Sequence, residues 1–135
     1  MPLSDWTGYR INGLARRMRE ESDRALEPLG LSVKHFGALL ALAEHGALAQ
    51  HQLGQELRVD RTSMVALVED LERAGHVARA RNPADRRAYV IELTAAGKAA
   101  RREAEKRLRQ VERELLSALS AAERRQLVEL LARLG

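Results

Sequence analysis

Four arginines and one aspartate fall between residues 79 and 87 and give this short stretch a net charge of +3. Guanidinium groups gathered in one part of a chain can bind a polyanion, above all the phosphates of a nucleic acid. The whole chain has 23 basic and 19 acidic residues, for a formal net charge of +4. So modest an excess also fits an ordinary solvated surface, so the prediction rests on how the charges are distributed. The stretch contains Arg79, Arg81, Asp85, Arg86 and Arg87.

A second candidate surface lies between Asp60 and Gly75, a stretch with the signals of one helix. The Asp60 carboxylate suits an N-cap, and Gly75 suits the left-handed residue that closes a helix. Thr62 and Ala66 fall on the outer face, where short side chains let another surface approach closely. The free N–H groups and positive dipole end at such a helix start favour phosphate. The inward face is predicted from i, i+3, i+4 and i+7 spacing and contains Met64, Leu67, Val68 and Leu71.

Further helices must position this stretch. A turn over residues 58–60 joins it to a short preceding helix, which is the helix-turn-helix arrangement. The earlier helices are expected within residues 1–29 with Ser4 or Asp5 as cap, from the cap Ser32 to about Gly46, and over about 50–57.

Past Gly75 the sequence alternates with a period of 2, which predicts a β-hairpin. Asn82-Pro83 breaks the alternation, so we expect Ala84 to Arg87 to form the tip of the hairpin. This places the basic stretch on a projecting loop.

Two helices are expected to end the chain. Thr94 suits the cap of a long helix over about 95–119, and Ser120 to Glu123 form a capping-box pattern for the last one. The last helix is apolar over a wide arc, which we interpret as a surface for a second copy of the chain.

These elements predict a mainly α fold with a small β-hairpin wing: a winged helix-turn-helix flanked by N- and C-terminal dimerisation helices. We expect a single domain over residues 1–135, in which 31–94 bind DNA and 1–30 and 95–135 form the dimer. The chain has no cysteine, no apolar run near the roughly 20 residues of a membrane span, and no signal-peptide pattern at its start. We therefore expect a cytoplasmic protein without cofactor.

Three alternatives compete with DNA binding. A metal-responsive regulator would need histidine ligands, but no two histidines stand at i, i+4 beside an acidic partner. Catalysis is not expected, because Gly-rich phosphate loops, His-Glu-x-x-His and Gly-x-Ser-x-Gly are absent. A helical protein-interaction module would explain the terminal helices but not the basic hairpin. The histidines are His35, His45, His51 and His76.

Three signatures in this order resemble the MarR (multiple antibiotic resistance regulator) family of winged-helix transcription factors. They are Leu71-Glu72-Arg73-Ala74-Gly75-His76-Val77, Asp85-Arg86-Arg87 and Leu93-Thr94-Ala95-Ala96-Gly97. The resemblance covers nearly the whole chain. It implies a homodimer that binds pseudo-palindromic duplex DNA, as a repressor that a small, often aromatic or phenolic, effector releases.

The resemblance also implies where DNA is contacted. The recognition helix would enter the major groove, with Thr62 at base edges and Arg61 on a phosphate or a guanine. Many relatives carry an arginine or a polar residue where Val65 and Ala66 stand, so we expect apolar contact and DNA shape to contribute more to specificity here.

The wing arginines would reach the minor groove, with Asp85 pairing with one of them to hold the loop, and the third helix would begin near a phosphate. The predicted DNA-contacting set is Gln50, His51, Arg61, Thr62, Ser63, Val65, Ala66, Arg79, Arg81, Asp85, Arg86 and Arg87.

An effector pocket is predicted between the dimerisation helices and the winged domain, where aromatic rings would stack on a ligand and a polar group would anchor it. The alternative is that Trp6 and Phe36 are ordinary core or interface aromatics. The candidate lining residues are Trp6, Tyr9, Arg16, His35 and Phe36.

Overall fold

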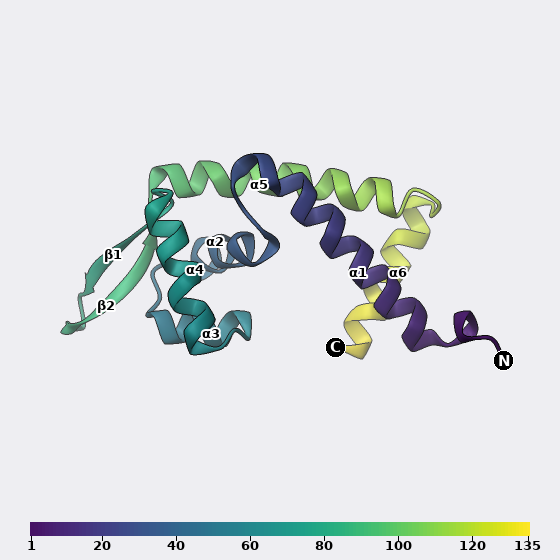
Figure 1. The fold of residues 1–135 in the computed structure, drawn as a ribbon, viewed down its shortest axis with the longest axis horizontal. Helices are drawn as coiled ribbons and strands as arrows, with labels where there is room; N and C mark the ends of the chain where they lie inside the picture. Colours follow the sequence, from purple (N-terminus) through teal and green to yellow (C-terminus); the bar gives the residue numbers. More distant parts are fainter.

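Six α-helices, two 3-10 turns and one β-hairpin make up the computed structural model, which describes all residues from Met1 to Gly135 (Figure 1). The predicted fold, mainly helical with a two-stranded wing, is confirmed. In chain order the elements are η1 (Leu3–Asp5), α1 (Thr7–Leu26), η2 (Glu27–Leu29), α2 (Val33–His45), α3 (Gln50–Leu57), α4 (Arg61–Arg73), β1 (Val77–Asn82), β2 (Asp85–Leu93), α5 (Ala95–Leu115) and α6 (Ala121–Leu134).

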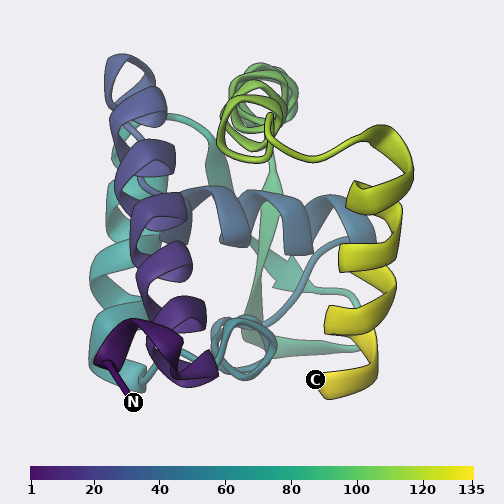
Figure 2. The same ribbon diagram turned by 90° about the vertical axis from the view of Figure 1, so that its right-hand side faces the viewer.

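The buried core lies in the middle of the chain, where α2, α3 and α4 pack together with β2 and α5. The four inward positions predicted for the helix after Asp60 are all buried in it. By contrast, α1 buries only Ser22 and Leu26, and α6 buries no residue. The molecule is therefore a helix-turn-helix body with two arms, α1 and α6, which stand apart on either side of α5 in Figure 2.

Side-chain caps set the starts of most helices. Ser32 accepts a hydrogen bond from the His35 N–H, Thr94 accepts one from the Gly97 N–H, and Asp60 accepts one from the Ser63 N–H. Ser120 and Glu123 form the predicted reciprocal capping box. The predictions for these four starts are confirmed, because an N-cap needs only a local side chain and a local N–H group.

Two helix ends differ from the predictions. Ser4 and Asp5 do not cap α1, because the 3-10 turn η1 holds them and Trp6 occupies the N-cap position without a side-chain bond. The long helix α5 ends at Leu115 rather than near residue 119. A turn over residues 116–119 follows, in which the Leu119 N–H donates to the Leu116 carbonyl, and Ser120 then adopts the extended backbone (φ −67°, ψ 165°) of the α6 cap.

The turn between α3 and α4 is held by a close approach of its backbone. A Cβ atom on Gly54 would lie 3.0 Å from Met64 Cγ and 3.2 Å from the Val59 carbonyl oxygen. The Val59 N–H donates to the Gly54 carbonyl at 2.9 Å, and Arg58 adopts a left-handed conformation with φ 55°. The turn therefore depends on a glycine and aims the N-terminus of α4 away from the core.

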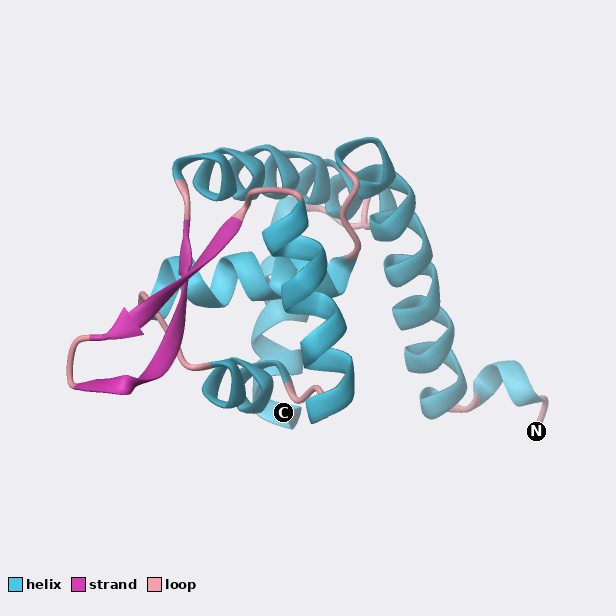
Figure 3. Ribbon diagram, turned by 60° about the vertical axis from the view of Figure 1, so that its left-hand side comes forward, coloured by secondary structure: helices cyan, strands magenta, loops and turns pink.

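The hairpin is tighter than predicted. Pro83 and Ala84 alone connect the strands, and Asp85, Arg86 and Arg87 already belong to β2. The pairing shifts register between Arg81, which faces Tyr89, and Asn82, which faces Asp85, so residues 86–88 bulge from the ladder. Figure 3 shows the resulting twisted wing projecting from the helical body.

Candidate nucleic-acid interface

The N-terminus of α4 presents a short, polar surface. Asp60 accepts from the Ser63 N–H and from the Ser63 hydroxyl, both at 2.8 Å. These bonds, the backbone one first, hold the pKa of the Asp60 carboxyl below its ordinary value. Thr62, Val65 and Ala66 remain exposed on the outer face, whereas the Ser63 hydroxyl is already engaged by the cap.

A groove of about 690 Å³ runs between α3 and the start of α4. It brings together three residues of the predicted contact set, Gln50, His51 and Arg61, and adds Gln55 and Arg58. The sequence reasoning missed these two, although a long basic side chain in the turn between two helices was a usable signal. Arg58 and Arg61 have no carboxylate partner in the structure, so both are available to an anion. The groove is lined by Gln50, His51, Gly54, Gln55, Arg58, Val59, Arg61 and Met64.

Arg79 ties the base of the wing to the helices. Its Nε donates to Glu72 at 2.9 Å, and its Nη2 donates to the Gln50 side-chain carbonyl at 3.2 Å. The guanidinium therefore connects β1 with the end of α4 and the start of α3. In this free state Arg79 positions the wing rather than presenting an open charge.

Arg81 holds the wing bulge. Its Nη1 donates to the Arg86 backbone carbonyl at 2.6 Å, and its guanidinium carbon lies 5.0 Å from the centre of the Tyr89 ring, a cation–π arrangement. Tyr89 lies beside Arg81 and is exposed.

Arg86 and Arg87 are the exposed charges of the wing. Asp85 accepts from the Arg87 N–H at 3.1 Å and from Arg87 Nε at 3.3 Å, so the predicted pairing of Asp85 with an arginine is confirmed. It forms two residues along the same strand and not across the hairpin. The Arg87 side chain nevertheless stays 93% exposed. An ion pair this exposed is weak and exchanges readily for a phosphate.

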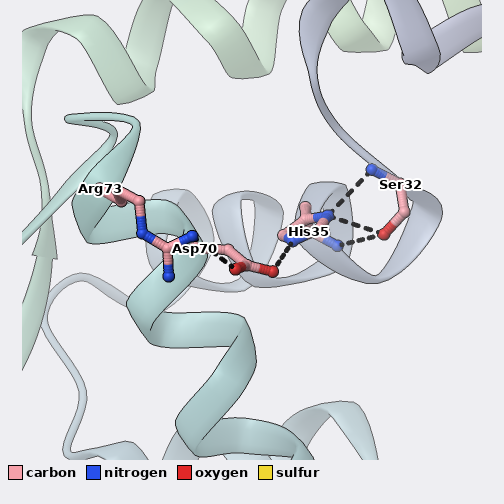
Figure 4. Close-up of polar contacts among 4 residues, drawn as sticks. All are labelled: Ser32, His35, Asp70 and Arg73. Atoms are coloured by element: carbon pink, nitrogen blue, oxygen red, sulfur yellow. Dashed lines mark hydrogen bonds and ion pairs between the residues drawn. The ribbon is translucent and has the colours of Figure 1, made fainter.

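A polar chain joins the start of α2 to the far end of α4 (Figure 4). His35 Nε2 lies 3.0 Å from Asp70 Oδ2, and His35 Nδ1 accepts from the Ser32 N–H at 3.0 Å. Because Nδ1 is an acceptor, the proton of the neutral ring sits on Nε2 and points to Asp70. Arg73 lies 3.7 Å from the other Asp70 oxygen. His35, predicted to line an effector pocket, contacts Asp70 of the recognition helix α4 in this structure.

The predicted effector residues do not meet in one cavity of a single chain. Trp6 and Tyr9 lie on and beside the outer half of α1, 56% and 51% exposed, and Arg16 is exposed further along. Phe36 packs against the core instead. The main cavities of the chain are not lined by Trp6, Tyr9, Arg16 or Phe36, and His35 lines one of them beside Asp70 and Arg73.

The histidines and carboxylates of the chain do not gather into a metal site. No group of three or more histidine, aspartate or glutamate side chains is placed to hold a metal ion. His45 instead pairs with Glu56 at 3.1 Å. None of the helices has the length and apolar character needed to cross a membrane.

A capped helix presented by a tight turn, next to a hairpin with exposed arginines, defines a winged helix-turn-helix protein of the DNA-binding class. A family model described as "MarR family" matches residues 29–88. The HTH-type transcriptional repressor Rv2887 of Mycobacterium tuberculosis is 31% identical over 128 residues, which cover 95% of this chain and 92% of the repressor. The chain belongs to the MarR family of transcriptional regulators.

Solved structures agree along the whole chain. The complex of Rv2887 with DNA has a TM-score of 0.83 at 30% identity and covers 100% of this chain and 98% of its own. The complex of Rv2887 with salicylic acid has a TM-score of 0.74 at 31% identity, with coverage of 96% and 98%. The repressor CouR, known from Rhodococcus jostii RHA1, has a TM-score of 0.88 at 29% identity when bound to a 23-mer duplex, with coverage of 98% and 94%.

Proposed function

We propose that two copies of this chain bind one pseudo-palindromic DNA duplex and repress transcription from it until a small aromatic acid releases them. The observation that carries this proposal is the joint presentation of the α4 N-terminus and the wing, held together by the Arg79 bonds to Glu72 and Gln50. The DNA complexes of Rv2887 and CouR support the DNA partner. Since the chromosome is the target, we place the protein in the cytoplasm and assign it no catalysis.

Within the interface, α4 would read the major groove. Its N–H groups and positive dipole end suit a phosphate, while the methyl groups of Thr62 and Ala66 suit a thymine methyl group. Val65, 41% exposed, adds a further apolar contact. Because no long polar side chain leaves the middle of this face, the sequence-dependent shape of the DNA would carry a large share of the specificity.

Phosphates and the minor groove would be contacted on either side of α4. The groove between α3 and α4 offers Arg58, Arg61 and His51 to the backbone of one strand. The wing offers Arg86 and Arg87 to the adjacent minor groove, whose electronegative potential attracts arginine. Arg79, Arg81 and Asp85 would act by holding the wing in place.

The arms would form the dimer, with residues 1–30 and 95–135 contributing and residues 31–94 left for DNA in a single domain. Leu130, Leu131 and Leu134 are exposed on α6, and Trp6, Tyr9 and Ile11 are exposed at and near the start of α1. Apolar area of this kind is normally covered by a partner. Trp6, Tyr9 and Arg16 of one arm could then meet a second copy and complete the effector pocket that one chain lacks.

Selection of bound duplexes from a random pool tests the proposal. The expected product is an inverted repeat whose half-sites lie about one helical turn apart. Repetition with salicylic acid, the ligand in the Rv2887 complex, is expected to lower recovery of the same sequences. Recovery of unrelated duplexes without a shared motif would contradict specific recognition, and unchanged recovery with the acid would remove this effector class.

A further inference from the structure

The outer face of α5 carries a straight row of positive charges. The residues follow one another at spacings of 4, 4, 3 and 4, which places them on one side of a helix. On a helical wheel this side is opposite to Ala104 and Val111, the buried residues of α5. All five side chains are exposed. We call this row the α5 ridge; it consists of Lys98, Arg102, Lys106, Arg109 and Arg113.

The ridge is poorly neutralised. Glu105 is the one acidic residue paired with it, and it is shared between Arg101 at 3.0 Å and Arg109 at 2.8 Å. The Arg109 guanidinium holds the pKa of the Glu105 carboxyl below its ordinary value. Lys98, Arg102, Lys106 and Arg113 form no ion pair, and the Arg113 guanidinium donates only to the Gln110 side chain. Glu105 lies at the edge of the ridge beside Arg102, Lys106, Arg109 and Arg113, so one negative charge stands against five positive ones.

The ridge faces away from the recognition surface. In Figure 1, α5 forms the upper edge of the molecule, α2 and α4 lie below it, and the wing points down and away from it. DNA held by α4 and the wing therefore lies on the opposite side of the body, and the ridge does not reach that stretch of duplex. Its charge needs a different explanation.

Phosphate explains the ridge better than a protein surface does. Protein interfaces have an apolar or aromatic centre, whereas this face holds only alanines beside its charges. Two copies would also repel each other across it, so we place the dimer contacts of residues 95–135 on α6 and on the other faces of α5. From Lys98 to Arg113 the helix rises by 15 steps of 1.5 Å, about 22 Å, which equals the rise of roughly six phosphates of one strand. Phosphate contact requires only charge at regular spacing and no base readout.

We propose that the α5 ridge binds a second segment of duplex DNA through its phosphates, without sequence preference, while α4 and the wing hold the operator. The protein would thereby bring two duplex segments together. Because the ridge and the operator-binding surface lie on opposite faces, binding by the ridge can be tested separately from operator recognition.

A capture assay measures the second site. A selected operator duplex is tethered to beads and saturated with protein, and a fluorescent duplex lacking the operator is then added. Wild-type protein is expected to capture it with a log–log salt slope near −4.5, from about 0.9 per phosphate contact over five contacts. The triple variant Arg102→Gln, Lys106→Gln, Arg113→Gln should reduce the slope by about 2.7 and weaken capture by roughly 100-fold or more at 0.1 M salt.

Charge-matched variants keep the test specific. Arg19→Gln, Arg24→Gln, Lys34→Gln removes the same charge from exposed sites on α1 and α2 and should leave capture unchanged. The molecular mass from light scattering and the affinity for the tethered operator should be the same for wild type and both variants. Capture that is absent in the wild type, or equal in the α5 triple variant, overturns the proposal. In a competition experiment, polyglutamate and unlabelled DNA are each added to displace the captured duplex. Displacement by polyglutamate at a lower concentration of charge than by DNA would indicate an acidic protein partner and would also overturn the proposal.

Discussion

The arginines of this protein divide into those that hold the structure and those that remain free. Arg79 donates hydrogen bonds to Glu72 and Gln50, and Arg81 donates one to the Arg86 carbonyl. Arg87 is held only by the exposed Asp85. An exposed pair contributes little to stability, so the Arg87 guanidinium can move to DNA at small cost.

Replacement of Arg87 by alanine is therefore expected to weaken operator binding without unfolding the wing. Loss of one phosphate contact per protomer should lower the magnitude of the log–log slope of operator affinity against salt concentration by about 1.8 for the dimer. The affinity itself should fall by roughly 10- to 100-fold at 0.1 M salt. A gel-shift titration at several salt concentrations measures both. Arg24→Ala, an exposed arginine paired with Glu21 on α1, is the matched control. Equal affinity of the two variants would exclude the wing from the interface.

Among the elements, the junction of α4, the wing and α5 is the most tightly specified. The Thr94 hydroxyl donates to the Gly75 carbonyl at 2.6 Å while its oxygen accepts from the Gly97 N–H. A Cβ atom on Gly97 would lie 1.9 Å from the His76 carbonyl oxygen. The Leu-Thr-x-x-Gly signature thus has a physical basis, since one residue caps α5 and the other lets the preceding backbone approach it.

The cap of the recognition helix predicts a pH dependence. The pKa of Asp60 is lowered in the folded protein from an ordinary value of 3.8, mainly by the Ser63 N–H. A lowered pKa stabilises the fold above the unfolded-state value and loses that effect as the pH falls through the folded-state value. The melting temperature of wild type relative to Asp60→Asn should be constant from pH 7 to about pH 5 and decline below about pH 4.

The Asn side chain keeps the capping geometry but has no carboxyl group to titrate. The other carboxylates are the same in both proteins, so their effects cancel in the difference between the two melting temperatures. A difference that grows as the pH falls would contradict the assigned direction. Glu123→Gln in α6, whose carboxylate pKa is lowered by bonds from Ser120, should show the same sign but leave operator binding unaffected.

At the scale of the whole molecule, the apolar arms make the chain incomplete by itself. Four large apolar residues of α6 are exposed, and no residue of that helix is buried. Such an area would be costly to leave in water. A second copy would cover it and hold two recognition helices at a fixed separation.

Leu131→Glu is accordingly expected to dissociate the dimer, because a carboxylate would be buried in the apolar interface. Loss of bivalent binding should weaken operator affinity by about 100-fold or more. Sedimentation and gel shifts measure the two effects on one preparation. Ala122→Glu adds the same charge at an exposed position on the side of α6 opposite to Leu131 and should change neither. A dimeric Leu131→Glu protein would show that α6 does not form the interface.

The sequence alone determined the elements and most of their boundaries. Ser32, Asp60, Thr94 and Ser120 cap helices through bonds to residues three positions away, and the inward face of α4 follows from its spacing. Local contacts of this kind are contained in a few neighbouring residues. The predicted cap of α1 and the predicted end of α5 differ from the structure, where a 3-10 turn holds Ser4 and Asp5 and a turn follows Leu115.

Only the tertiary structure decided which side chains are free to act. Arg79 meets Gln50 across 29 residues, and His35 meets Asp70 across 35. Arg79, a predicted DNA contact, and His35, a predicted effector contact, are therefore held by other side chains of the folded chain. The groove that adds Arg58 likewise exists only once α3 and α4 pack. The physical reason is that residue type and spacing specify local geometry, whereas the pairing of a long side chain depends on what folding brings within about 3 Å of it.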